Sequence, residues 1–185
     1  MMRDVTLQMI YEHPIAQKYV RRAGMAHAIS VASHAFNLAH KYDANPDWAA
    51  KAGFLHDIGH YTWFRDGEWD YQLYQDCDIH PIKGAERAHK LLVRLGEDKK
   101  AAKEISHAIL FHTESALPQG QFELNSLQTV VHLADEKDKQ PGDLHHYRNI
   151  NQEKERHLMK ILDEKIDLDS GNYTEKMSIG IDYNR

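Results

Sequence analysis

The sequence predicts an all-α domain on the basis of two observations, and a third marks a possible exception. Apolar residues recur every three or four positions through most of residues 25–135, which is the period of an amphipathic helix. Helix-start signals, such as Asn45-Pro46-Asp47 and His80-Pro81, precede several of these stretches. An alternation typical of a strand is found near the C-terminus, over residues 177–183. We therefore expect a helical bundle with a small C-terminal helix, followed at most by a short β-hairpin.

The first two predicted helices each have a histidine at one end. Over residues 25–42 an apolar stripe runs through Val31, and His27 lies four residues earlier on the same stripe. The next helix has Pro46 in its first turn, where proline is well tolerated, and runs to His56. We expect His27 to point inward and His56 to end an apolar helix.

Residues 60–79 are rich in aromatic and charged side chains. They are predicted to form a long ordered loop or a short helix over the neighbouring histidines, with a strand as the less favoured alternative. The aromatic residues in this segment include Trp63, Phe64, Trp69, Tyr71 and Tyr74.

Three further helices are predicted, over residues 80–96, 98–112 and 126–135. The first begins at a His-Pro pair, and Asp98 and Ser126 can cap the other two. Each helix has a metal-capable side chain either at its entrance or at the end of its apolar stripe. These side chains are His80, His112 and Asp135.

The length of the chain is most simply that of one domain. We assign residues 1–145 to its main part, with a motif core over residues 20–138. Residues 146–185 are predicted to be an extension of the same domain, with a charged amphipathic helix over residues 152–165.

Composition excludes several classes of function. The 185-residue chain has 23 Lys and Arg against 28 Asp and Glu, and it has no basic run of the kind that binds polymeric nucleic acid. Because Cys77 is the sole cysteine, an intrachain disulfide is excluded. No signal peptide follows Met1, and no apolar run is long enough for a membrane span, so we expect a cytoplasmic protein. The 14 histidines are the unusual feature, because they are spread along the chain.

Metal-capable residues recur on separate predicted helices, as they do where helical bundles build metal sites between facing helices. A buried carboxylate without a partner costs several kcal/mol, and a divalent metal is one partner that offsets this cost. Mixed His and Asp ligands favour iron, manganese, cobalt, nickel or zinc over calcium, and we expect iron or manganese first. The candidate ligands are His27, His56, Asp57, His80, His112 and Asp135.

This pattern resembles the HD-domain metal-dependent phosphohydrolase superfamily over about residues 20–138. The most specific matches are the run Ala52-Gly53-Phe54-Leu55-His56-Asp57-Ile58-Gly59, then His80-Pro81-Ile82-Lys83-Gly84-Ala85, His112-Thr113 and Leu133-Ala134-Asp135. Within the superfamily, the pattern is most similar to the branch of symmetrical diadenosine tetraphosphate hydrolases. It departs from that branch at Glu136-Lys137-Asp138-Lys139 and in its C-terminal stretch.

The resemblance implies a set of ligand roles. Four residues would hold one metal: His27, His56, Asp57 and Asp135. The second metal would be held by His80 and His112, with Asp57 bridging the two, so that a metal-activated water attacks phosphorus. If only one metal binds, His80 and His112 would contact the substrate phosphate instead. In either case the catalytic residues would be Asp57 and His56.

Candidate substrate contacts are weaker predictions. His60 follows the central motif where the family often has a basic residue, and Lys83 and Arg87 lie one and two turns into the helix that starts at His80. His132, one turn before Asp135, is the histidine most expected to support a metal ligand indirectly. The other histidines, His145 and His146 among them, are expected in surface or packing roles. The 61–74 aromatics could stack on a nucleobase, or they could form a local core or an oligomer contact.

We expect a phosphohydrolase that acts on a phosphomonoester or phosphoanhydride, most plausibly of a nucleotide. Two alternatives stay open. One is a di-iron oxygenase, because the resemblance extends to HD-type oxygenases with the same ligands, and the other is a regulatory module that binds metal or nucleotide without turnover. The sequence also leaves a homodimer open.

Overall fold

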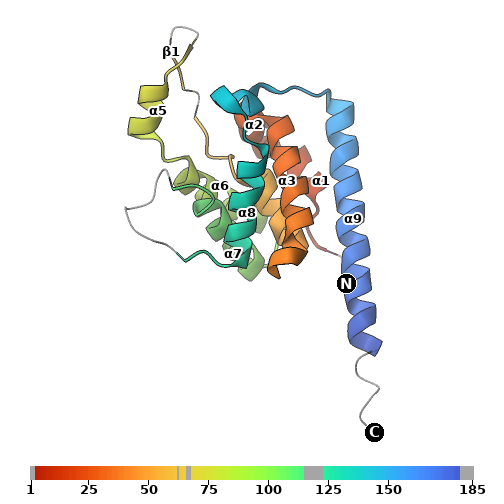
Figure 1. Ribbon diagram of the computed structural model, residues 1–185. Helices are drawn as coiled ribbons and strands as arrows, with labels where there is room; N and C mark the ends of the chain where they lie inside the picture. Colours follow the sequence, from red (N-terminus) through yellow and green to blue (C-terminus); the bar gives the residue numbers. More distant parts are fainter. Residues whose placement is uncertain (1–2, 62, 66–67, 115–122, 180–185) are drawn as a thin grey trace.

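The computed structural model describes residues 3–61, 63–65, 68–114 and 123–179, which are helical through most of that length (Figure 1). The predicted all-α class is confirmed, and a pair of two-residue strands is its exception among the described residues. In chain order the elements are α1 (Leu7–Glu12), α2 (Pro14–Ala23), α3 (Met25–Ala39), η1 (His40–Tyr42), α4 (Pro46–Leu55), β1 (Phe64–Arg65), β2 (Glu68–Trp69), α5 (Tyr71–Cys77), α6 (His80–Leu95), α7 (Lys99–Leu110), α8 (Ser126–Asp138), η2 (Pro141–Tyr147) and α9 (Gln152–Ile179).

Helix α3 is the centre of the bundle. It packs against α4 on one side and α8 on another, while α6 pairs with α7 and α4 also contacts α7 (Figure 1). The facing surfaces of α3 and α4 are rich in small residues, with Ala32, Ala35 and Ala49 fully buried. At Gly53, even a Cβ atom would lie 3.0 Å from the Val31 carbonyl oxygen. Small side chains therefore let the two backbones approach closely, which brings the ends of α3 and α4 together.

Gly59 brings the turn after α4 against the start of α6. A Cβ atom at this position would overlap the carbonyl oxygen of His80 and the backbone of Gly84. Only glycine fits such a close approach between two backbones. The His56-Asp57 turn is thereby held beside His80, although 24 positions separate His56 from His80 in the sequence.

Most predicted helix starts are confirmed, with one correction. Asn45 accepts a hydrogen bond from the Trp48 N–H, and Asp98 accepts hydrogen bonds from the first turn of α7. For α8, however, the N-cap is Asn125 rather than Ser126, because Asn125 and Gln128 form a reciprocal capping box. The box satisfies two backbone donors, which a cap at Ser126 would not do with the same pair.

The segment 60–79 contains both of the elements that the sequence allowed. Strands β1 and β2 pair antiparallel, with Phe64 opposite Trp69, and α5 follows after Asp70, which caps it. The short helix predicted there is confirmed, and the less favoured strand is also present.

The predicted C-terminal β-hairpin is wrong for residues 177–179, which belong to α9. Ile181 and Tyr183, the rest of that alternating pattern, lie outside the described residues. Met159, Leu162 and Ile166 are buried and anchor α9 against the bundle. Once a helix is anchored, each added residue gains a backbone hydrogen bond, whereas an isolated hairpin is marginally stable at best.

Helices α1 and α2 lie outside the sequence-based predictions. Leu7, Ile10 and Tyr11 of α1 are buried, and α9 runs along the outside of the bundle, where it packs against α1 and α3 (Figure 1). None of the helices in the described part of the chain has the length and apolar character needed to cross a membrane.

Candidate metal centre

Two pairs of histidines face each other around Asp57. The Nε2 atoms of His27 and His56 lie 3.1 Å apart, and those of His80 and His112 also lie 3.1 Å apart. Asp57 directs Oδ2 toward the first pair, 3.3 Å from His56 Nε2 and 3.7 Å from His27 Nε2. Its Oδ1 lies 3.4 Å from His80 Nε2 and 3.6 Å from His112 Nε2. One carboxylate therefore contacts both pairs through different oxygens.

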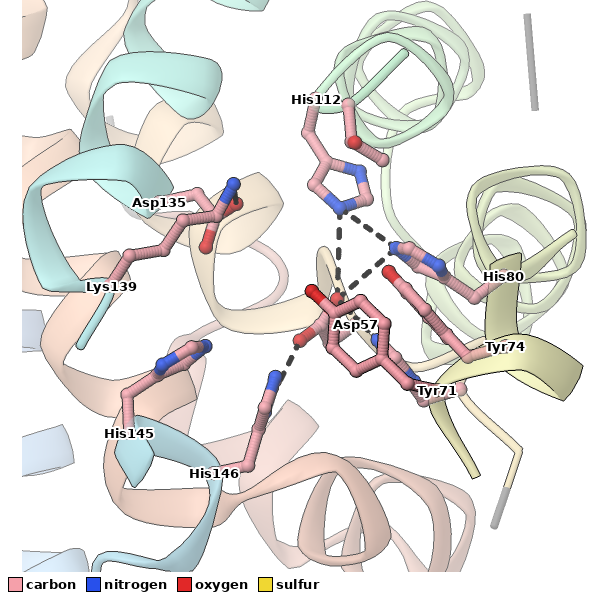
Figure 2. A pocket seen from close by; sticks show the side chains of 11 residues that line it. Asp57, Tyr71, Tyr74, His80, His112, Asp135, Lys139, His145 and His146 are labelled. Atoms are coloured by element: carbon pink, nitrogen blue, oxygen red, sulfur yellow. Dashed lines mark hydrogen bonds and ion pairs between the residues drawn. The ribbon is translucent and has the colours of Figure 1, made fainter. Parts of the chain in front are cut away.

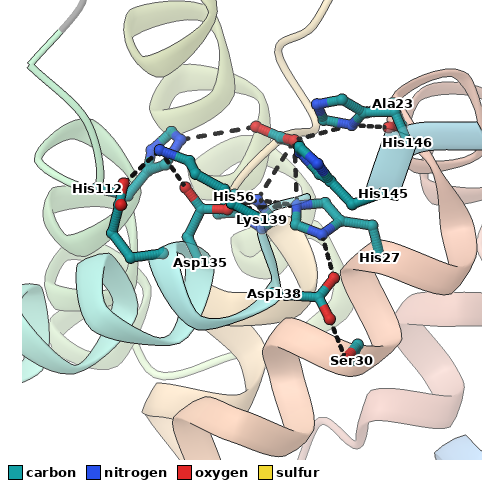
Figure 3. Close-up of polar contacts among 12 residues, drawn as sticks. Ala23, His27, Ser30, His56, His112, Asp135, Asp138, Lys139, His145 and His146 are labelled. Carbon is teal, nitrogen blue, oxygen red and sulfur yellow. Dashed lines mark hydrogen bonds and ion pairs between the residues drawn. The ribbon is translucent and has the colours of Figure 1, made fainter. Parts of the chain in front are cut away.

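Asp135 of α8 completes the first group. Its Oδ1 lies 3.3 Å from His27 Nε2 and 3.5 Å from His56 Nε2. All of the predicted metal ligands are thus brought together from α3, α6, α8 and the ends of α4 and α7 (Figures 2 and 3). None of these side chains belongs to a residue that is more than 5% exposed.

One histidine of each pair is oriented by a carboxylate. The Nδ1–H of His27 donates to Asp138 at 2.6 Å, and Asp138 also accepts a hydrogen bond from the Ser30 hydroxyl at 2.6 Å (Figure 3). In the second pair, the Nδ1–H of His80 donates to Asp78 at 2.5 Å. Such partners fix the orientation of the ring and leave its other nitrogen free for a metal.

The second histidine of each pair is oriented by the backbone. His56 donates its Nδ1–H to the Gly53 carbonyl oxygen at 2.7 Å, and His112 donates its Nδ1–H to the Ile109 carbonyl oxygen at 2.6 Å. With Nδ1 protonated, the neutral form of each ring carries its lone pair on Nε2.

These hydrogen bonds direct imidazole lone pairs and carboxylate oxygens at one another. Lone pairs 3.1 Å apart repel unless a cation lies between them. One shared proton can relieve a single contact, whereas a divalent ion serves three or four donors at once. The donor set of imidazole and carboxylate suits first-row transition metals. The residues present therefore fit the divalent metals that their pattern implies.

The electrostatics of the centre also favour a cation. Burial acts to raise the pKa of Asp57, but His56, His60 and His112 hold it well below its usual range. Burial acts to lower the pKa of His56, but Asp57 and Asp135 together raise it well above its ordinary value. Burial lowers the pKa of His112, and it lowers the pKa of His60 to about 3. The carboxylates are thus ionised and favour a positive charge beside them, at His56 above all, whereas the rings of His60 and His112 resist protonation.

A cavity of about 270 Å³ opens onto this centre (Figure 2). Asp57 lies at its middle, with His80, Tyr71 and Tyr74 on one side and Lys139, His145 and His146 on the other. His60 also lines it, with Nε2 3.5 Å from Asp57 Oδ1.

His145 and His146 were not predicted in the site. They lie on η2, which returns to the cavity because the His146 Nδ1–H donates to the Ala23 carbonyl oxygen at 2.6 Å (Figure 3). Gly24 makes this contact possible, since a Cβ atom there would lie 2.9 Å from the His146 carbonyl oxygen. Adjacent histidines after Pro141 are a weak signal in the sequence, and their distance from the motif gave no reason to place them here.

Lys83 and Arg87 are not among the described residues that line the cavity. Arg87 donates a hydrogen bond to the Ile58 carbonyl oxygen, and its guanidinium lies 3.7 Å from the centre of the Tyr19 ring. This placement gives Arg87 a structural contact and lends no support to the predicted substrate contact. Lys139 lines the cavity instead.

Two further expectations concern nearby rings. His132 donates its Nδ1–H to the His112 carbonyl oxygen at 2.9 Å, and so it supports a predicted ligand indirectly. Trp63 is buried and packs edge-on against Tyr74, with ring centres 5.7 Å apart, as in a local core. Tyr71 and Tyr74 line the cavity. The aromatic segment therefore divides between packing and the cavity wall.

Comparison with known proteins agrees with this geometry. Residues 24–164 match the HD domain family model. The chain is also 59% identical over 166 residues to "Putative phosphohydrolase YueE" of Bacillus subtilis (strain 168), and the match covers 90% of this chain and 94% of the relative. No solved structure matches significantly. The chain therefore belongs to the HD domain family and is a hydrolase of the HD superfamily.

Proposed function

We propose that this protein is a metal-dependent phosphohydrolase that cleaves a phosphomonoester or phosphoanhydride, most plausibly of a nucleotide. The observation that carries the proposal is the division of the Asp57 oxygens between two groups of ligands, with His27, His56 and Asp135 on one side and His80 and His112 on the other. A cytoplasmic location and a preference for iron or manganese are parts of the same proposal.

Divalent ions held by these residues would supply Lewis acidity toward a phosphoryl oxygen and lower the pKa of a bound water. The protein's own contribution is placement. Asp57 would set the separation of the two groups, because its two oxygens are fixed within one carboxylate. His60, neutral and 3.5 Å from Asp57, would donate a hydrogen bond to the phosphoryl group. The surrounding buried helices would limit access of bulk water.

The size of the cavity bears on the substrate. Ligand pockets commonly measure roughly 300–1,000 Å³, and this one has about 270 Å³. That volume supports a substrate with one small organic group better than a dinucleotide of the kind cleaved by the similar diadenosine tetraphosphate hydrolase branch. Tyr71 and Tyr74 on the cavity wall are suited to contact a planar group such as a nucleobase.

The test combines metal analysis with a substrate screen. Protein purified without chelator is expected to contain divalent metal and to release phosphate from one or more mononucleotides. Asp57→Ala should lose metal from both groups and lower kcat by about 10³-fold or more, since several kcal/mol of transition-state stabilisation are removed. His157→Ala, which changes an exposed histidine on α9, is the matched control.

Full phosphate release by Asp57→Ala would contradict the proposal. Substrate-dependent oxygen consumption without phosphate release would identify an oxygenase instead. Tight nucleotide binding without any turnover would identify a regulatory module.

A further inference from the structure

One wall of the cavity has donors rather than metal-capable lone pairs. It is formed by Lys139, directly after α8, and by His145 on η2, both facing the cavity across from Tyr71 and Tyr74 (Figure 2). The proposed metal ligands do not include either residue.

His145 is a buried hydrogen-bond donor. The residue is 2% exposed, and its Nδ1 accepts a hydrogen bond from the Gln140 backbone N–H at 3.2 Å. A ring that accepts at Nδ1 carries its proton on Nε2. Among the described residues, no acceptor is bonded to this Nε2–H. This Nε2 is not among the described buried side-chain atoms that lack a partner, so it is open to solvent in the cavity, where a ligand oxygen can accept its hydrogen bond.

His145 is not suited to hold a third metal. Ring nitrogens of His27, His145 and His146 lie within 4.8 Å of one another, which by distance alone would allow an ion. However, His27 directs Nδ1 at Asp138 and Nε2 at the first ligand group, and Nδ1 of His146 donates to the Ala23 carbonyl oxygen. With Nε2 of His145 protonated, only one lone pair remains, on His146. The cluster therefore lacks the ligands that a metal needs.

Lys139 adds a positive charge at the same wall. Its Nζ lies 3.7 Å from Asp135 Oδ2 and also forms an ion pair with the exposed Glu136, and its side chain is 44% exposed at the edge of the cavity. Asp135 belongs to the first ligand group, so an anion bound over that group lies within reach of the ammonium. Charge-assisted hydrogen bonds of this kind are about twice as strong as neutral ones.

The wall is held in place by contacts outside the cavity. Arg148 forms an ion pair with Asp138, and its Nε–H donates to the His145 carbonyl oxygen at 3.4 Å. The bond from His146 to Ala23 ties the same segment to the end of α2. These contacts keep His145 in position before a ligand arrives, and such preorganisation favours binding.

We propose that Lys139 and His145 form an anion subsite that holds a non-bridging phosphoryl oxygen of the substrate or of product phosphate. This inference rests on the proposed phosphohydrolase function and specifies which side of the cavity receives the phosphoryl group. The tyrosine side is then left for the rest of the substrate.

Inorganic phosphate is the probe for this subsite, because its binding is measured without turnover. Titration calorimetry on the metal-loaded protein should show that His145→Ala and Lys139→Gln each weaken phosphate binding by about tenfold, the effect of one lost charge-assisted hydrogen bond. His145→Gln, which keeps an N–H donor, should recover part of this loss. Metal content, measured by elemental analysis, should be unchanged in all three variants.

The controls are His157→Ala and Lys137→Gln, which change exposed residues of the same types. If His145→Ala fails to fold, Lys139→Gln decides the matter alone. Unchanged phosphate affinity in the folded variants, or no phosphate binding by the wild type, overturns the subsite. Loss of metal in His145→Ala would overturn it in favour of a ligand role. A protein that hydrolysed none of the screened compounds but bound phosphate in this pattern would contradict the proposed function and leave the subsite intact.

Discussion

The cluster of Tyr11, Arg21 and Glu155, where α1, α2 and α9 meet, differs from the metal centre in how its charge is balanced. Glu155 is 1% exposed, and it accepts hydrogen bonds from the Tyr11 hydroxyl at 2.7 Å and from Arg21 at 3.0 and 2.8 Å. Each buried charge thus has an opposite charge or a donor within the protein. Glu155 thus joins α9 to the consecutive helices α1 and α2, with partners 144 and 134 positions away in the sequence.

The metal centre, in contrast, is built mainly from acceptor groups that would all bind a cation. Asp57 and Asp135 face imidazole lone pairs, and Lys139, the lysine among the described cavity-lining residues, lies at the edge. Buried charges that are paired stabilise a fold, whereas converging acceptors require something from outside. The comparison separates residues that maintain the bundle from residues that prepare it to bind a cation.

Asp138→Asn is expected to have the largest effect, and it acts on the metal centre. Asp138 orients His27 and has no place among the proposed ligands, so its loss acts through the ring that it holds. We expect metal affinity to fall by roughly 10- to 100-fold, measured by competition with a chromogenic chelator. Asp4→Asn, at an exposed aspartate, should leave affinity unchanged. Equal affinity in Asp138→Asn would show that the carboxylate does not orient the ligand.

Glu155→Ala tests the other cluster. It leaves Arg21 and the Tyr11 hydroxyl without their buried acceptor, and Arg21 is already 38% exposed, so we expect a loss of about 2 kcal/mol in the free energy of unfolding. Urea denaturation measures this quantity. Glu153→Ala, which changes an exposed glutamate two residues earlier on α9, is the control. Metal affinity should be unchanged. A large drop in metal affinity would show that the two clusters do not act independently.

The smallest expected effect is the change with pH in the stability that Glu155 contributes. Burial acts to raise the pKa of the Glu155 carboxyl, but hydrogen bonds from Arg21 and Tyr11 hold it below its ordinary value of 4.5. A carboxyl with a lowered pKa in the folded state stabilises the protein above its unfolded pKa, and this contribution is lost as the pH falls through the folded value. The advantage of wild type over Glu155→Gln, about 1 kcal/mol near neutrality, should therefore shrink below about pH 4.5. Urea denaturation of both proteins at several pH values checks this, and a constant difference would contradict it.

Helical faces and helix starts were largely readable from the sequence. The stripe that includes His27 and the proline-led starts of α4 and α6 depend on neighbours three or four positions away, and they appear as expected. The choice of Asn125 over Ser126 as a cap and the helical end of α9 were missed. In both cases the preference depends on a specific pairing or anchor, which residue type alone does not specify.

The candidate site divides in the same way. The candidate ligands could be selected because each lies at the start or the end of a predicted apolar helix, within a short motif, whereas Lys139, His145 and His146 have no such local pattern. Arg87 looked suited to phosphate by sequence position, but it lies against Tyr19 and the Ile58 carbonyl. The position of Arg87 in its helix does not determine which neighbouring element its side chain contacts.

The sequence by itself determined most of the helices between residues 25 and 138, their apolar faces and the side chain types that could hold a metal, because these depend on interactions over a few residues. Only the tertiary structure decided that the oxygens of Asp57 divide between two histidine pairs and that η2 returns with His145. The physical reason is that distances between helices depend on close packing. Small residues between α3 and α4, and Gly59 against the start of α6, let backbones from separate parts of the chain approach closely enough for those atoms to meet.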